Sequence, residues 1–131
     1  MSGWASTAAA AFMVVAAVLC VAAIPAVFQD PDASVIGASG SLLMVAVVNA
    51  GMAFAVIASQ RVRVGLILIA LFTAGLSLFA LDGAASMSTH ANAPAVLPLL
   101  FWGVVGADGV AVVATMVAAI ASPRARRPAS A

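Results

Sequence analysis

The sequence predicts an all-α integral membrane protein, a bundle of four transmembrane helices with both termini in the cytoplasm. Composition is the first of three observations behind this prediction. Of the 131 residues, 66% are apolar and only 7% are charged, whereas soluble domains are about 45–50% apolar and about 25% charged. The mean hydropathy is +1.25. A water-soluble fold of this size would have too few polar residues to cover its surface, so the expected environment is a lipid bilayer.

Four long apolar segments are the second observation. A bilayer core of about 30 Å is crossed by roughly 20 helical residues, and each segment reaches this length. The whole chain is expected to be one membrane domain, with helices at about residues 4–28, 35–59, 62–81 and 97–121.

The connections between these segments are marked by turn-forming residues. Residues 29–32, Gln-Asp-Pro-Asp, form a turn signature, because Pro fixes φ and Asp bonds its own backbone. The link at 60–63 is so short that the second and third helices are expected to be antiparallel neighbours. Residues 82–94 form the longest expected loop, and Pro123 ends the last helix because Pro cannot continue it.

The first segment is expected to be a retained helix rather than a cleaved signal peptide. Residues 1–7 contain no Arg or Lys. The apolar run that follows is longer than the 7–15 residues usual for a signal sequence.

The third observation is the distribution of charge. All five basic residues are arginines, and they lie in the second link and in the basic tail of residues 122–131: Arg61, Arg63, Arg124, Arg126 and Arg127. The other two connections carry only acids: Asp30, Asp32 and Asp82. The positive-inside rule therefore places the tail and both termini in the cytoplasm. The expected location is the inner (plasma) membrane of the cell, crossed several times.

Small residues are expected to hold the helices together, because lipid tails are as apolar as leucine and burial alone does not drive association. At about 100° per residue, five small residues of the fourth helix fall on one narrow stripe. They are Gly103, Ala107, Ala111, Ala114 and Ala118. We expect the fourth helix to pack along this stripe.

Asp108 is the only charged residue inside an apolar segment. An acid at such a depth costs about 2.5–3.5 kcal/mol on insertion scales, so it usually serves a contact or a function. Asn49 and Thr73 are expected at a similar depth, and Thr115 on the same side of the fourth helix as Asp108. No arginine lies near that depth, which favours a neutral acid that donates to Asn49 or Thr73. These four residues form the candidate membrane-embedded polar site.

Three roles are open for Asp108 at this stage. It forms a structural hydrogen bond inside the bundle, it contacts another subunit, or it is a working proton or cation site as in pumps and transporters. The carboxyl lies at the margin of the small-residue stripe, about 100° from its centre.

Enzymatic activity is not expected, and neither is a cofactor or a metal. The sequence has no nucleophile–base pair, no zinc-ligand spacing and no pair of membrane histidines. Met87 and His90 in the expected outer loop are too few to form a metal site. The single cysteine, Cys20, excludes an intrachain disulfide. A net charge of +1 gives no electrostatic preference for nucleic acid.

These observations favour a non-catalytic membrane component: an accessory or assembly subunit, or a homo-oligomer. Its expected partners are the lipid bilayer and either another membrane subunit or a second copy of the chain. The alternative is a small proton- or cation-coupled transporter or pore that uses Asp108.

Overall fold

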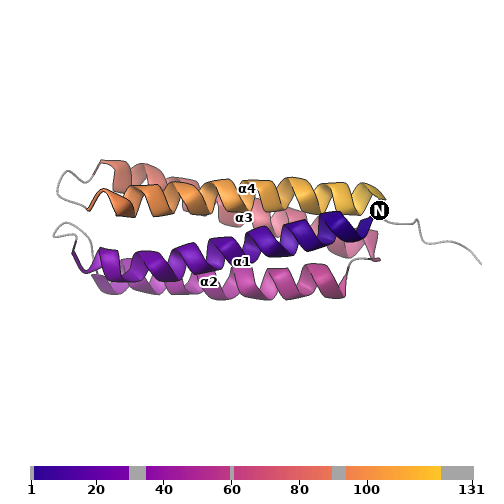
Figure 1. The fold of residues 1–131 in the computed structure, drawn as a ribbon, viewed down its shortest axis with the longest axis horizontal. Coiled ribbons are helices and arrows are strands. Elements are labelled where there is room, and N and C mark those ends of the chain that lie inside the picture. The colour runs from indigo at the N-terminus through magenta and orange to yellow at the C-terminus, as the bar shows by residue number, and fades with distance from the viewer. Residues whose placement is uncertain (1, 30–34, 60, 90–93, 122–131) are drawn as a thin grey trace, which may run out of the picture.

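The computed structural model describes residues 2–29, 35–59, 61–89 and 94–121. It contains four α-helices and, within the described ranges, no strand: α1 (Ser2–Val27), α2 (Val35–Ala58), α3 (Arg63–Ser88) and α4 (Val96–Ala121) (Figure 1). All four are long and apolar enough to span a membrane. The predicted fold class, an all-α membrane bundle of four helices, is confirmed.

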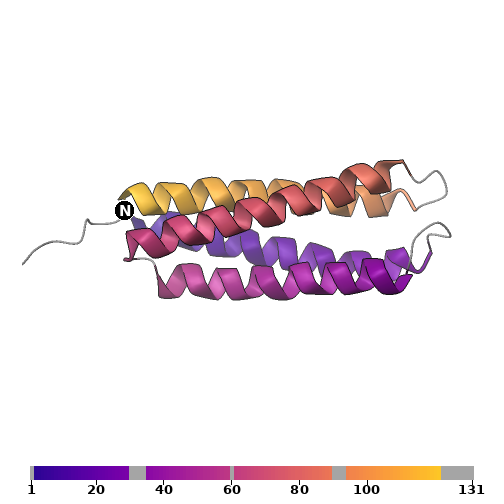
Figure 2. The same ribbon diagram turned by 180° about the vertical axis from the view of Figure 1, so that it is seen from behind.

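The helices alternate in direction along the bundle (Figures 1 and 2). We call the end with the α1–α2 and α3–α4 connections the distal end, and the end with the N-terminus and the α2–α3 connection the terminal end. Helix α1 packs against α2 and α4, and α4 packs also against α3. Helices α2 and α3 run antiparallel as expected but pack only slightly against each other. Their small buried residues face other helices, so the short link between them does not make a packed pair.

Three helices have their predicted limits to within two residues, but α3 ends at Ser88 instead of Leu81. The predicted loop beginning at Asp82 is therefore wrong. The extra turns are stabilised by tertiary packing, because Ala84 and Met87 are buried. The helix is closed by Thr89, whose backbone N–H donates to carbonyls of the last turn.

Asp30, Asp32, His90 and the basic tail at 122–131 lie outside the described residues. The predictions made for the 29–32 turn and for the tail therefore stay predictions.

The core is divided into two apolar clusters. One lies toward the distal end and includes Ala16, Cys20, Val45, Val104 and Ala107. The other lies toward the terminal end and includes Met13, Ala53, Leu66, Ile69 and Ala111. Buried polar side chains of α2, α3 and α4 lie at the level between them: Asn49, Thr73 and Asp108.

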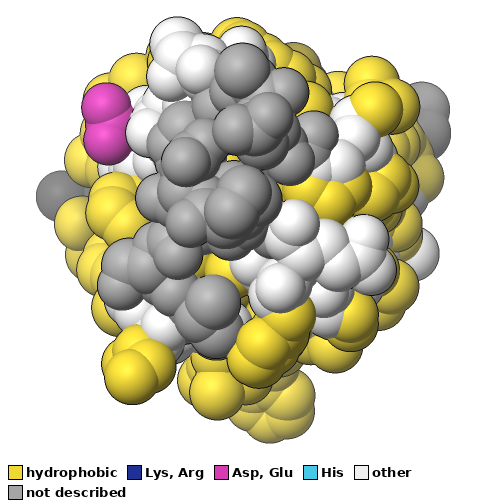
Figure 3. Space-filling view, turned by 90° about the vertical axis from the view of Figure 1, so that its left-hand side faces the viewer, with side chains coloured by type: hydrophobic (Ala, Val, Ile, Leu, Met, Phe, Trp, Pro, Cys, Tyr) yellow, Lys and Arg dark blue, Asp and Glu magenta, His cyan; other side chains and the backbone are white. Residues whose placement is uncertain are grey.

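The outer surface of the bundle is apolar, as a lipid-facing surface requires. Large side chains such as Phe54 and Ile120 are mostly exposed. Viewed from the distal end, hydrophobic side chains surround much of the bundle, and an acidic side chain lies at its edge (Figure 3). Trp4 and Trp102 are also exposed and lie near helix ends, where indole rings favour the membrane–water interface.

Helix α4 is anchored along the small-residue stripe. The four alanines of the stripe are buried: Ala107, Ala111, Ala114 and Ala118. At Gly103 the neighbouring helix comes so near that an added Cβ would stand 3.1 Å from Leu19 Cδ1. A side chain at this position would therefore require the Leu19 side chain to shift.

The terminal end of α4 is held by an arginine of α3. The Arg63 guanidinium donates from Nε to the Ala119 carbonyl at 3.0 Å and from Nη2 to the Ile120 carbonyl at 3.1 Å. These carbonyls belong to the last turn of α4, where intrahelical donors are lacking and a cation is favoured by the helix dipole. The sequence indicated only a topological role for Arg63.

Candidate functional site

Asn49 of α2 and Asp108 of α4 meet inside the bundle. The two helices stand apart, since each packs against α1 and not extensively against the other. Neither side chain has any exposed surface. Asn49 Nδ2 lies 3.5 Å from Asp108 Oδ2 and also donates to the Val45 carbonyl at 3.0 Å. Because N–H···O bonds usually measure about 2.7–3.2 Å, the contact between the two side chains is a weak hydrogen bond.

The pair has more acceptors than donors. Asp108 Oδ1 and Asn49 Oδ1 are buried and have no hydrogen-bond partner among the described residues. Buried polar atoms are nearly always paired, and leaving one unpaired costs about 1–3 kcal/mol. Each of these oxygens would be satisfied by a donor or a positive charge, such as a proton on the carboxyl, a small cation or a water molecule.

The two threonines of the predicted polar site do not bond to this pair. Thr73 Oγ1 donates to the Ile69 carbonyl at 2.8 Å, and Thr115 Oγ1 donates to the Ala111 carbonyl at 2.7 Å. Both hydroxyls are buried, and each forms its hydrogen bond within its own helix. The structure thus brings Asn49 and Asp108 together and leaves Thr73 and Thr115 as separate polar groups.

Asp108 is also nearer the centre of the bundle than its place at the edge of the small-residue stripe suggested. Its side chain is fully buried within a single chain. It therefore has no surface with which to touch another subunit from the outside of this bundle.

Cys20 of α1 is a neighbour of the pair that the sequence did not indicate. Its thiol is buried in the distal cluster, which also contains Val45 and Val104. Counting depth does not find it, because Cys20 lies seven residues, about 10 Å, from the distal end of α1, whereas Asp108 lies about 18 Å from the distal end of α4.

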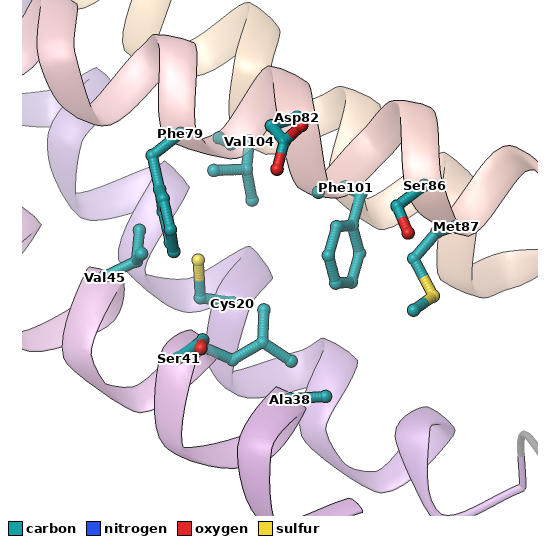
Figure 4. Close-up of a pocket in the computed structure, with 13 residues that line it drawn as sticks. Cys20, Ala38, Ser41, Val45, Phe79, Asp82, Ser86, Met87, Phe101 and Val104 are labelled. Carbon is teal, nitrogen blue, oxygen red and sulfur yellow. The ribbon is translucent and has the colours of Figure 1, made fainter. Parts of the chain in front are cut away.

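A cavity of about 180 Å³ lies on the distal side of the pair (Figure 4). All four helices contribute to its wall, and it lies where α2 and α3 fail to pack. Val45 and Val104 line it, and each stands one helical turn from Asn49 or Asp108 respectively. One turn of helix therefore separates the cavity from the buried pair.

On the terminal side, the pair is covered by the second apolar cluster, formed mainly by alanines of α1 and α4 with Met13, Val56, Leu66 and Ile69. The cavity therefore lies toward the distal end from the pair, and the apolar cluster lies toward the terminal end. Among the described residues, no group of three or more His, Cys, Asp or Glu side chains is placed to hold a metal ion.

Fold and site together define a small polytopic membrane protein with a buried carboxyl–amide pair near the middle of the bundle. Comparisons with models of protein families, with curated proteins and with solved structures give no match. Function is therefore argued from the site alone.

Proposed function

We propose that the protein is a small proton- or cation-coupled carrier of the plasma membrane, in which the Asp108 carboxyl binds the coupling ion. The observation that supports this role is the buried pair with two unpaired oxygens, Asp108 Oδ1 and Asn49 Oδ1. A proton or a small cation supplies the positive charge that these acceptors lack. The role needs no enzyme chemistry, cofactor or resident metal.

A purely structural role explains the pair less well. The single bond between Asn49 and Asp108 is long, at 3.5 Å, and such bonds in membranes contribute only about 0.6 kcal/mol on average. That is less than the approximately 2.5–3.5 kcal/mol that an acid at this depth costs. Helix α4 is already packed through its buried alanines, so Asp108 is not needed to hold it.

The surroundings of the pair fit alternating access. Asp108 lies near the middle of α4 (Val96–Ala121), as do the coupling-ion sites of many transporters, which are near the bilayer midplane. The cavity approaches it from the distal side, and an apolar cluster covers it on the terminal side. This arrangement corresponds to a carrier whose site faces one side of the membrane.

The proposed orientation places both termini in the cytoplasm. Arg61 and Arg63 lie at the terminal end of the described bundle, and α4 ends at Ala121 on that side. Each basic residue near an anionic leaflet adds about 1 kcal/mol of membrane affinity. The distal end, with the cavity, then faces the outside of the cell.

The carrier role is tested by flux in liposomes that contain the purified protein, with an H⁺ gradient followed by a pH-sensitive dye and a Na⁺ gradient followed by a sodium-sensitive dye. Wild type is expected to dissipate one of these gradients, and Asp108→Asn to lose the flux while remaining folded. Thr115→Val is the matched control, because it removes a buried polar group from α4 that is not bonded to the pair. An Asn variant with full wild-type flux would contradict the role.

The second candidate is an accessory subunit or a homo-oligomer, and one observation favours it. The lipid-facing surface of α1 and α2 forms a shallow apolar groove that includes Ala17, Ala22, Ala46 and Ala50, and small residues let helices approach closely in membranes. Tagged purification in mild detergent with mass spectrometry tests it. A stoichiometric membrane partner, retained in Asp108→Asn, would favour this candidate over the carrier.

A further inference from the structure

The cavity between α2 and α3 has mostly apolar walls. Leu42, Val45 and Val104 line it from α2 and α4. The rings of Phe79 and Phe101 extend into it from α3 and α4 (Figure 4). Aromatic faces attract cations as well as apolar groups, because the ring quadrupole is negative at its face.

The polar part of the cavity is acidic. Asp82 is the only charged residue among the described residues that line it, and the Asp82 and Ser86 side chains point from α3 toward the cavity (Figure 4). Ser41 faces them from α2. The described arginines, Arg61 and Arg63, lie at the opposite end of the bundle. The cavity therefore complements a positively charged guest.

The size of the cavity limits this guest. About 180 Å³ is less than the roughly 300–1,000 Å³ of pockets for drug-sized ligands. A single ring with a short charged group is of the appropriate size. A lipid acyl chain would contact the apolar walls but would leave the Asp82 carboxyl, which is exposed at the edge of the cavity, without an opposite charge.

We infer that this cavity binds a small organic cation, an ammonium group on an apolar body of about one ring, with the charge at Asp82 and the body between Phe79 and Phe101. The inference rests on the proposed carrier function and names the class of its substrate. Val45, Val104 and the Cys20 thiol then separate the bound cation from the ion site at Asp108 by one turn of helix.

The test is calorimetric titration of the full chain in nanodiscs of uncharged lipid with benzyltrimethylammonium, whose charge does not change with pH. Saturable binding is expected. Asp82→Asn is expected to weaken it about fivefold, which corresponds to the upper range for solvent-exposed ion pairs. Asp32→Asn is the matched control, since it removes the same charge from the α1–α2 connection, and is expected to leave the affinity unchanged.

A second variant tests the cavity without changing its charge. A Cβ at Gly83 would stand 3.2 Å from Phe101 Cε2, whereas at Gly75 it would meet no described atom within 4 Å. Gly83→Ala is therefore expected to displace the Phe101 ring and weaken binding, and Gly75→Ala to leave it unchanged.

The inference would be overturned by no saturable binding of benzyltrimethylammonium, by equal affinity in wild type and Asp82→Asn, or by equal affinity for the anion phenylmethanesulfonate. Binding of neutral benzyl alcohol as tight as that of the cation would likewise overturn it and indicate a pocket for lipid chains. If the protein binds the cation but shows no ion flux in liposomes, the carrier role is contradicted and the cavity site is still supported. Flux that depends on Asp108 without binding of the cation would contradict the cavity site alone.

Discussion

The packing of the helices positions Asp108 and Asn49, and the contact between these two side chains contributes little to the stability of the bundle. Their side chains are fully buried and touch through one long hydrogen bond, and each retains an oxygen without a partner among the described residues. Desolvation penalises a charged carboxyl strongly and a neutral one much less. The bundle therefore tolerates Asp108 best when a proton or a bound cation offsets its charge.

The first prediction concerns the strength of this pair. A double-mutant cycle with Asn49→Ala and Asp108→Ala is expected to give a coupling of about 0.6 kcal/mol, the average for hydrogen bonds within membranes. The measurement is reversible unfolding in bicelles. A parallel cycle with Thr73→Ala and Thr115→Ala should give no coupling, because each hydroxyl bonds its own helix. A coupling above about 2 kcal/mol for Asn49 and Asp108, beyond the range of such bonds, would indicate that the pair has a mainly structural role and would contradict the prediction.

Helix α4, like α1, packs closely against two other helices, in its case α1 and α3. Its small residues allow close approach on one side, and the Arg63 guanidinium binds its terminal carbonyls. These two features lead to separate predictions.

Gly103→Val is expected to destabilise the bundle by about 1–3 kcal/mol, the usual cost of overpacking. The new side chain would start 3.1 Å from Leu19 Cδ1. Gly106→Val on the same helix is the control, because a Cβ there meets no described atom within 4 Å. Unfolding midpoints in the same detergent measure the difference, and equal midpoints for the two variants would show that α1 and α4 do not approach closely at Gly103.

Arg63→Ala is expected to lower stability by about 0.3–1 kcal/mol, the usual contribution of a cation at a helix C-terminus. Arg61→Ala removes the same charge two residues away from an exposed position and is expected to have a smaller effect. Thermal unfolding of the two variants is the measurement. Equal losses of stability in the two variants would mean that a positive charge at this end of the bundle is stabilising in general and that Arg63 does not act specifically as a cap of α4.

Helix number and depth could be predicted from the sequence, whereas the rotation of a helix could be predicted only for α4, from its stripe of small residues. The length of each apolar segment determines where it crosses the membrane, and counting depth predicted that Asn49 lies near Asp108. Lipid-facing and core-facing sides of these helices are equally apolar, so periodicity does not indicate which face points inward. For this reason Cys20, the Arg63 cap and the cavity became visible only in the structure.

The extension of α3 to Ser88 was missed for a related reason. Residues 82–88 are rich in Ser, Gly and Ala, a composition that also occurs in loops. Their helical state depends on burial of Ala84 and Met87 against neighbouring helices, which is a tertiary effect that local composition does not contain.

The whole molecule is asymmetric from end to end. The distal half contains a cavity where α2 and α3 fail to pack, whereas the terminal half of the core is covered by alanines and larger apolar side chains. In the proposed orientation, which follows from the positive-inside rule, the cavity faces outward.

This orientation gives a prediction for intact cells. In a Cys20→Ala background, a cysteine at Thr89 is expected to react with a membrane-impermeant maleimide added outside, and a cysteine at Val62 only after the cells are opened. Both positions are exposed and lie at opposite ends of the bundle. Labelling of Val62 but not Thr89 from outside would invert the topology.

The most direct test of the central claim is an infrared titration of the carboxyl at Asp108, since it requires no knowledge of the substrate. Difference spectra between wild type and Asp108→Asn in lipid are recorded over the pH range in which both are folded. The claim predicts a carboxylic-acid carbonyl band that is specific to Asp108 and is replaced by a carboxylate band as the pH rises, or as a small cation is added. A carbonyl band that neither pH nor cations change would show that the Asp108 carboxyl releases no proton and binds no cation, which would contradict the proposed ion site.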